Sequence, residues 1–170
     1  MAELKEKIAK LFPDATFEDG DILLVNIADE KWHDCALALR DTLGFDFLVT
    51  IVGVDWKDKL GCVYYLTNTT NNEHLSVRVT TDNVETPMLH SVADLWSIAG
   101  IFEREVYDFF GIVFINNPDM RRIFLSIDWK GFPLRKNYDE SEEINPVTVE
   151  NERQTDFTDT YVELPDGKVE

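Results

Sequence analysis

Cysteine is scarce in this sequence, with only Cys35 and Cys62 among 170 residues. The two thiols are far apart and form no CxxC pair. This chain alone therefore has too few thiolates for an iron–sulfur cluster or a structural zinc site. We expect no metal or redox cofactor in the chain, and we expect Cys35 to pack in or near the core.

Basic residues are also few. The 16 Lys and Arg are outnumbered by 33 Asp and Glu, which gives a formal net charge of -17. Affinity for phosphate backbones and anionic lipid headgroups comes from clustered Lys and Arg. Nucleic acid is therefore not an expected partner, and neither is an anionic membrane surface.

Long apolar runs are missing as well. The longest, FLVTIVGV at 47–54, is far shorter than the roughly 20 residues that a membrane-spanning helix needs. The first residues, MAELKEKIAKLF, are charged and amphipathic and lack the apolar centre of a signal peptide. We expect no direct membrane insertion, so any membrane association would come through partner subunits.

Standard chemical motifs are absent. The sequence contains no GxGxxG, GxxxxGK[ST], HExxH or GxSxG, the short motifs for dinucleotides, nucleoside triphosphates, zinc proteolysis and esterase chemistry. The histidines are scattered, and His90 with Asp94 has the i, i+4 spacing of two ligands on one helical face. Two ligands do not make a strong metal site, so an ion pair is the simpler interpretation.

The periodicity of apolar residues predicts an α+β fold, with helices packed on one face of a mainly antiparallel sheet and an extended C-terminal tail. Apolar residues at helical spacing indicate helices, whereas β-branched and aromatic runs bounded by turn residues indicate strands. The predicted helices are 2–12, 29–43 and a long one that opens at Thr86-Pro87 and continues to Phe110, with a kink at Gly100; the predicted strands are 22–28, 45–54, 62–69, 74–80 and 112–116.

The composition changes after Tyr138, which divides the chain into a domain at 1–138 and a tail at 139–170. The tail holds 11 acidic and 2 basic residues. Such a segment can be a flexible solubilising tail, because it buries little apolar surface. Its spaced apolar residues favour, to about the same degree, an arm that becomes ordered on a partner subunit; they are Phe157, Tyr161, Val162 and Leu164.

The stretch FEREVYDFFG at 102–111 sets three ionisable side chains among aromatic ones. On a helical projection, Arg104 and Asp108 form an i, i+4 ion pair outside the apolar stripe, and Glu103 lies at its margin. Glu105 falls inside the stripe, where an ionised carboxylate is costly unless it is paired. The stripe that we expect to face the core consists of Ile98, Phe102, Val106 and Phe109, widened by Ala99, Ile101 and Phe110.

Three interpretations of Glu105 remain open. It can form an internal salt bridge, contact a partner protein, or act with Asp108 as an acid/base pair, since the two are about 60° apart on a helix. Buried carboxylates are usually paired rather than reactive, which favours the first. The candidate cations are Arg121, Arg122, Arg135 and Lys136, and their aromatic neighbours also suggest an interface, because Arg and aromatics together mark interface hot spots.

Three sequence blocks resemble a known family. FEREVYDFFGIVF at 102–114, NPDMRRI at 117–123 and DWKGFPLRKNY at 128–138 follow one another with short gaps. In this order they are similar to the signature of the C-type subunit of NADH:quinone oxidoreductase, the 30 kDa subunit family of respiratory complex I. The family usually has His at the position of Asn117 and commonly Asp at that of Asn137, which weakens any claim of an ionisable role there.

The resemblance implies a cytoplasmic, peripheral-arm subunit without a redox centre of its own, held at the cell membrane by its partners. Those partners would be the large quinone-site subunit (D type) and the terminal-cluster subunit (B type), and the iron–sulfur clusters, FMN and quinone would lie in partner subunits. The tail would extend over the D-type subunit. The signature and interface residues are Glu103, Arg104, Glu105, Asp108, Gly111, Arg121, Arg122, Asp128, Gly131, Pro133, Leu134, Arg135 and Lys136.

Two other functions remain open at this point. The chain can be the equivalent subunit of a membrane-bound hydrogenase or of a quinone reductase fed by another electron donor. It can also be a stand-alone enzyme that uses Glu105 and Asp108 in acid/base catalysis.

Overall fold

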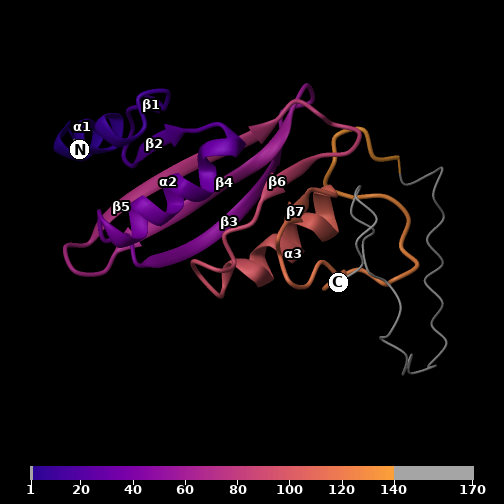
Figure 1. The fold of residues 1–170 in the computed structure, drawn as a ribbon. Coiled ribbons are helices and arrows are strands. Elements are labelled where there is room, and N and C mark those ends of the chain that lie inside the picture. The colour runs from indigo at the N-terminus through magenta and orange to yellow at the C-terminus, as the bar shows by residue number, and fades with distance from the viewer. Residues whose placement is uncertain (1, 140–170) are drawn as a thin grey trace.

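The structure is a computed structural model that describes residues 2–139. It contains a five-stranded sheet with strand order β1-β2-β5-β4-β3 (Figure 1), in which only the β2–β5 pair is parallel. Strands β6 and β7 form a separate parallel pair. The elements are α1 (Ala2–Leu11), β1 (Thr16–Glu18), β2 (Leu23–Asn26), α2 (Asp29–Asp41), β3 (Phe47–Asp55), β4 (Leu60–Asn68), β5 (Glu73–Thr81), β6 (Met88–His90), α3 (Ala99–Phe110) and β7 (Val113–Ile115).

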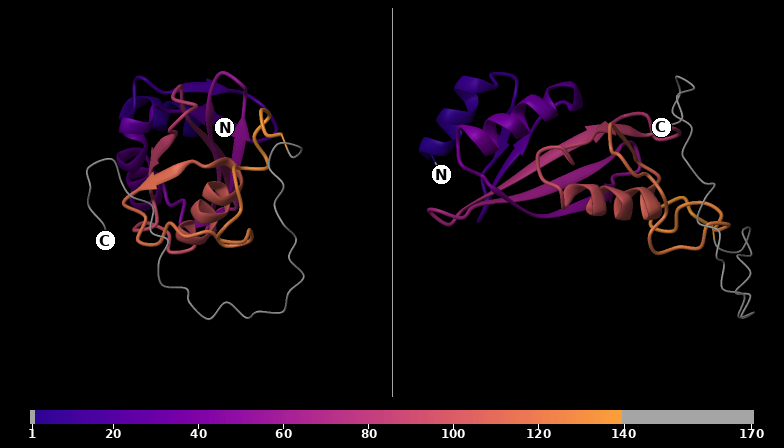
Figure 2. Two further views of the ribbon diagram at one scale, coloured as in Figure 1. Left: turned by 90° about the vertical axis from the view of Figure 1, so that its right-hand side faces the viewer. Right: turned by 60° about the horizontal axis from the view of Figure 1, so that its bottom comes forward.

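Side-chain contacts place helices α2 and α3 on the same face of this sheet, which Figure 2 shows in two further views. Trp32 of α2 contacts Tyr64 of β4, with ring centroids 4.4 Å apart. Gly53 of β3 lies opposite Cys62 of β4, and Cys62 shares a face with Tyr64 because it is two residues away. A Cβ at Gly53 would come within 2.6 Å of the Phe110 ring of α3. The predicted arrangement of helices on one face of a mainly antiparallel sheet is confirmed.

The core lies between this face and the helices. Alternate residues of β4 and β5 point into it, as the period of two along a strand requires. Cys35 of α2 is fully buried in the core, as the sequence predicts. The buried apolar side chains of β4 and β5 are those of Leu60, Cys62, Tyr64, Leu66, Leu75, Val77 and Val79.

The long helix predicted from Thr86-Pro87 to Phe110 is wrong in its first half. Met88–His90 is strand β6, and the helix begins only at Ala99. Proline favours the first turn of a helix, but here tertiary pairing decides, since the N–H of Val113 donates to the Pro87 carbonyl at 2.9 Å. The predicted strand at 112–116 is confirmed as β7, whereas the short strand β1 was not predicted from the sequence.

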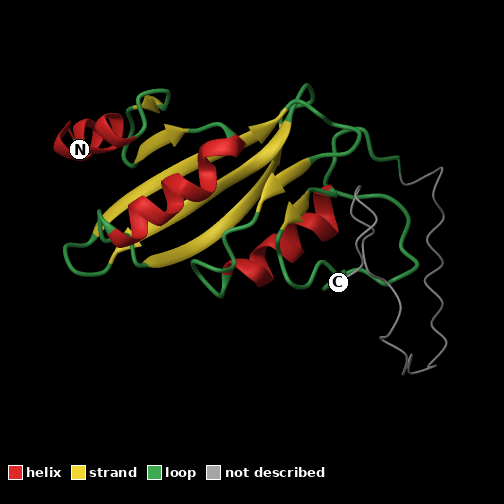
Figure 3. Cartoon of the chain, viewed as in Figure 1, coloured by secondary structure: helices red, strands yellow, loops and turns green. Residues whose placement is uncertain are grey.

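After β7 the chain runs to residue 139 without a helix or strand (Figure 3). We call residues 116–138 the signature loop, because it contains two of the three sequence blocks noted above. The predicted tail at 139–170 lies, apart from its first residue, outside the described residues.

Candidate subunit interface

The signature loop is fixed to helix α3 by Arg122. Its Nη1 donates to the Asp108 carboxylate at 2.8 Å and to the Asp108 carbonyl at 3.0 Å. Its Nη2 donates to the carbonyl oxygens of Trp129, at 3.1 Å, and Gly131, at 3.0 Å. One guanidinium therefore joins the end of α3 to two points of the loop, and it is the planar fork of Arg that makes this possible.

Asp108 of α3 also binds the signature loop directly, through backbone N–H groups. The side chain is fully buried, and its Oδ2 accepts hydrogen bonds from the N–H groups of Ile123, Phe124 and Leu125, at 3.2, 2.7 and 2.9 Å. Burial by itself would raise the pKa of Asp108, but these N–H groups and Arg122 together hold the pKa below its usual value. Asp108 is thus a buried, ionised anchor for the loop rather than a surface acid.

The predicted ion pair between Arg104 and Asp108 does not form. Arg104 instead donates to the carbonyl oxygens of Arg121, at 3.0 Å, and Arg122, at 3.2 Å, and its Nη1 lies 3.2 Å from the Asp119 carboxylate. An exposed i, i+4 pair contributes only a few tenths of a kcal/mol. The loop offers both side chains more partners, so each turns to the loop.

The buried acid on the opposite side of α3 is Glu103. Its carboxylate accepts hydrogen bonds from Ser91 Oγ at 2.7 Å, the Val92 N–H at 2.9 Å and Asn117 Nδ2 at 2.7 Å. Burial raises the pKa of Glu103 to about 7, although the three hydrogen bonds oppose the rise. The helical projection placed Glu103 at the margin of the apolar stripe, so this contact between α3 and the segments that follow β6 and β7 was missed.

Glu105 is half-exposed, and its carboxylate has no hydrogen bond or ion pair to any residue between 2 and 139. Three of its expected cations are engaged elsewhere: Arg121 pairs with Asp119, Arg122 pairs with Asp108, and Arg135 donates to carbonyl oxygens. The predicted internal salt bridge of Glu105 is therefore wrong for the described residues.

The predicted core stripe of α3 is also partly wrong. Ala99, Glu103 and Val106 are buried, whereas Ile98 and Ile101 are exposed. The helix has two apolar sides, and the sequence pattern merged them into one stripe. Glu105 belongs to the exposed side.

Gly111 ends α3 and makes room for an aromatic ring. Its φ is 70°, and a Cβ there would collide with the Phe132 ring. The Phe132 ring centroid lies 5.3 Å from the Arg122 guanidinium carbon and 5.0 Å from that of Arg135. Burial lowers the pKa of Arg135, whose Nε donates to the Phe110 carbonyl at 2.6 Å. This signature glycine is required by its backbone conformation and by the ring beside it.

The remaining signature residues lie in the same loop but contribute differently. The N–H of Leu134 donates to the Phe109 carbonyl at 3.1 Å, while its side chain is exposed. The N–H of Lys136 donates to the Asp55 carboxylate at 2.8 Å. Asp128 is exposed and Pro133 is half-buried. The structure thus brings Arg104, Asp108, Gly111, Arg121, Arg122, Gly131 and Arg135 into one network, and it leaves Glu105 and Asp128 outside.

Comparison with known proteins identifies the family. A model of the family described as "Respiratory-chain NADH dehydrogenase, 30 Kd subunit" matches residues 25–143, well over half of the chain. The chain belongs to this family. The resemblance of the three sequence blocks to the C-type subunit of NADH:quinone oxidoreductase is thereby confirmed.

Curated relatives of this 30 kDa subunit family support the assignment. The chain is 39% identical over 127 residues to the C-type subunit of the NADH-quinone oxidoreductase of Chlorobium phaeobacteroides, covering 71% of this chain and 75% of that protein. It is 48% identical over 147 residues to the combined C/D subunit of the NADH-quinone oxidoreductase of Phocaeicola vulgatus, covering 85% of this chain and 28% of that protein. The chain therefore spans little more than a quarter of the length of this C/D relative.

A solved structure shares the fold of this 30 kDa family member. A chain of the membrane-bound sulfane sulfur reductase (MBS), an archaeal respiratory membrane complex, superposes with a TM-score of 0.74, covering 95% of this chain and 98% of that chain. The sequence identity is 24%, so the likeness concerns the fold alone.

The described part of this family member contains no arrangement typical of a metal centre or a reactive thiol. No group of three or more His, Cys, Asp or Glu between residues 2 and 139 could hold a metal ion. Burial raises the pKa of Cys35 to about 12 and that of Cys62 well above its usual value, so both thiols stay protonated. Within the same residues, no helix has the length and apolar composition needed to cross a membrane.

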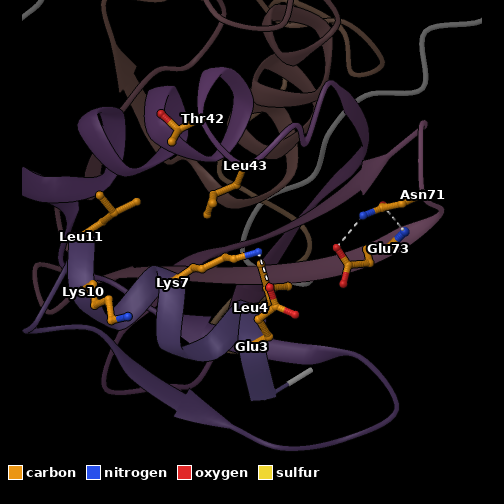
Figure 4. A pocket seen from close by; sticks show the side chains of 9 residues that line it. All are labelled: Glu3, Leu4, Lys7, Lys10, Leu11, Thr42, Leu43, Asn71 and Glu73. Atoms are coloured by element: carbon orange, nitrogen blue, oxygen red, sulfur yellow. Dashed lines mark hydrogen bonds and ion pairs between the residues drawn. The ribbon is translucent and has the colours of Figure 1, made fainter.

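Among the clefts on the surface of the described residues are two with charged residues in their lining. One, of about 690 Å³, lies beside α1, far along the chain from the signature residues, and its charged groups pair locally, as Glu3 does with Lys7 at 2.7 Å (Figure 4). The other, of about 520 Å³, lies where Arg135 and Lys136 meet Asp55, whose carboxylate already accepts backbone N–H groups. Neither of these two clefts is lined by Glu105 or Asp108, the acids considered for acid/base chemistry.

Proposed function

We propose that this chain is the non-redox structural subunit of the peripheral arm of a proton-translocating NADH:quinone oxidoreductase. In that role it braces the subunits that hold the terminal iron–sulfur cluster and the quinone site. One observation carries the proposal: the signature charges are engaged in holding the signature loop to α3. Asp108, Arg122 and Arg104 bond the loop to the helix, so their charged groups are occupied by structural contacts.

The partners that we propose are a D-type subunit, with the quinone site, and a B-type subunit, with the terminal cluster. Relatives in which C and D are named as one protein support the first partner, because a fused chain keeps the two parts in contact. We extend the proposal to the acidic tail at 139–170, which would become ordered on the D-type subunit. The iron–sulfur clusters, FMN and quinone would then all belong to partner subunits.

We also propose that the chain resides on the cytoplasmic side of the cell membrane and is held there by these partners. The net charge of -17 supports attachment through protein rather than through anionic lipid.

The test is a tagged copy of the chain expressed in its source organism in place of the untagged one. We expect D-type and B-type subunits to co-purify with it from native membranes, and we expect NADH:quinone reductase activity in the purified material. Deletion of the chain should abolish that activity, and the tagged copy should restore it. A stoichiometric chromophore bound to the isolated chain, or NADH oxidation by it, would contradict the proposal.

A subunit of a hydrogenase or of a complex with another donor remains the nearest alternative, and the fold shared with a chain of an archaeal respiratory complex is compatible with it. Assaying the purified complex with NADH and with other donors separates the two. The stand-alone enzyme is not favoured, because Asp108 is fully buried with both oxygens bonded and Glu105 lies on the exposed side.

A further inference from the structure

Helix α3 carries an exposed apolar ridge with one acid in it. At 100° per residue, Ile98, Ile101, Glu105 and Phe109 fall within about 80° of one another. Ile98 and Ile101 are 42% and 49% exposed, and the signature loop adds Phe124, which is 63% exposed. The rings of Phe109 and Phe124 stack with centroids 5.7 Å apart. We call these five residues the α3 ridge.

Glu105 differs from the other acids of this region. Glu103, Asp108 and Asp119 each accept hydrogen bonds from side chains or backbone N–H groups. Glu105 has no such partner among residues 2–139, although it is half-exposed and lies between apolar side chains. A carboxylate in this setting becomes costly once a second surface covers it, unless that surface supplies a cation.

We propose that the α3 ridge is a docking surface for the D-type partner, which presents apolar side chains around one Lys or Arg that pairs with Glu105. The inference rests on the proposed function and specifies the surface involved. Exposed Ile and Phe supply the apolar burial, and Glu105 supplies selectivity, because a partner without the cation leaves a buried charge unpaired.

Two other occupants fit the ridge less well. In a symmetric contact between two copies the ridge would face itself, which brings the two Glu105 carboxylates close together in a chain of net charge -17. The tail beyond the described residues holds only Arg153 and Lys168 as cations among many acids. Charge complementarity therefore favours a partner with a basic and apolar surface. The relative in which C and D are named as one protein makes the D-type subunit the candidate for this partner.

Cysteine labelling tests this directly. Both natural thiols are buried, so Ile101→Cys introduces a thiol that a fluorescent maleimide can reach. We expect fast labelling of the isolated full-length chain and at least about tenfold slower labelling in the complex purified from membranes. Leu37→Cys is the matched control, since Leu37 is an exposed aliphatic residue of another helix, and its labelling should be the same in both states.

Charge variants test the role of Glu105 in docking. Glu105→Gln should weaken retention of the D-type subunit on the tagged chain by about tenfold, and Glu105→Arg by more, because the partner cation then meets no anion or a like charge. The isolated variants should unfold at the wild-type temperature. Asp34→Asn, at an exposed acid of α2 that is not a signature residue, should leave retention unchanged.

The outcomes separate this inference from the proposed function. If wild-type chain fails to retain a D-type subunit, the proposed function fails. If it retains the subunit but Ile101→Cys labels equally fast in the complex, the ridge is not the docking surface. Slow labelling of the isolated chain that depends on its concentration would show a second copy on the ridge. Slow labelling that is relieved by deleting residues 140–170 would show the tail there, and either result overturns the proposal.

Discussion

Two fully buried carboxylates lie on opposite sides of helix α3, and their surroundings have opposite effects. Asp108 meets the Arg122 guanidinium and three backbone N–H groups, and its pKa is lowered. Glu103 meets only neutral donors, Ser91, Val92 and Asn117, and its pKa rises to about 7. Burial is common to both acids, so the nearby cation and the number of donors decide the charge state.

The difference also separates two structural tasks. Asp108 keeps its charge and anchors the signature loop on the outer side of α3. Glu103 joins α3 to the segments that follow β6 and β7 on the inner side, and its carboxylate takes up a proton near neutral pH. The same helix is therefore fixed by an ionic contact on one side and by a titratable one on the other.

Removing the Asp108 carboxylate should have the largest effect on stability. Asp108→Ala leaves the Arg122 guanidinium and three N–H groups without their acceptor, and we expect a loss of about 3 to 5 kcal/mol in the free energy of unfolding. Urea denaturation of the isolated chain measures it. Asp128→Ala, at an exposed acid of the same loop, should change stability by less than about 0.5 kcal/mol. Equal effects of the two variants would show that the Asp108 contact is not structural.

The titratable side should appear in the pH dependence of stability. Because the pKa of Glu103 in the folded protein, about 7, lies above its ordinary value of 4.5, the folded state binds more protons between these values. Glu103 therefore destabilises the fold most above pH 7. The contribution of Glu103 to the free energy of unfolding should become more favourable by about 2 to 3 kcal/mol as the pH falls from 8 to 5.

Asp108 has the opposite effect on the pH dependence of stability, and its effect appears only at lower pH. Its lowered pKa contributes stability above 3.8, which is lost as the pH falls through the folded-state value. Comparing wild type with Glu103→Gln between pH 5 and 8 isolates the Glu103 slope. A wild-type slope that persists in Glu103→Gln would have to come from another group.

A third variant disturbs the ionic side without changing a charge. Gly111→Ala forces a side chain into a positive-φ position against Phe132, which also contacts Arg122. We expect a loss of about 2 kcal/mol, measured by thermal or urea unfolding. Gly100→Ala is the control, because a Cβ at this helical glycine meets only Ala93 at 3.7 Å, and it should be neutral or slightly stabilising.

The smallest effect on folding is expected at Glu105, the third acid of the helix. Glu105→Gln in the isolated chain should change the free energy of unfolding by less than about 0.5 kcal/mol, because the side chain has no partner among the described residues. Differential scanning calorimetry at pH 7 is sufficient. A loss as large as that of Asp108→Ala would point to a contact of Glu105 with residues beyond 139.

The sequence predicted much of the fold because local patterns were clear. The helix at Asp29–Asp41 and the three strands of the central hairpins follow from periodicity and turn residues alone. The prediction from the sequence failed at Met88–His90, because these residues pair with Val113–Ile115 and no local signal encodes that contact. The same limit applies to the parallel pairing of β2 with β5.

The sequence singled out residues of the candidate interface but did not predict the contacts that they make. A helical projection gives angles around an axis, and it identified Arg104, Glu105 and Asp108 as unusual. It cannot show that a loop without regular structure covers the outer side of the helix, so it assigned the buried acid to Glu105 instead of Glu103 and Asp108. The contact of Asn117 Nδ2 with the Glu103 carboxylate joins residues 14 positions apart, and no local pattern in the sequence indicates it.

The parallel pairing of β2 with β5 has a consequence for synthesis on the ribosome. Leu23 lies opposite Leu75, and the loop that this contact closes contains α2, β3 and β4 in full. During translation β2 emerges before its partner strand exists, and closing so long a loop carries an entropic cost. Strand β2 thus emerges before β3, β4 and β5 but cannot pair with β5 until all three have been made, and until then its apolar side chains are open to chaperones.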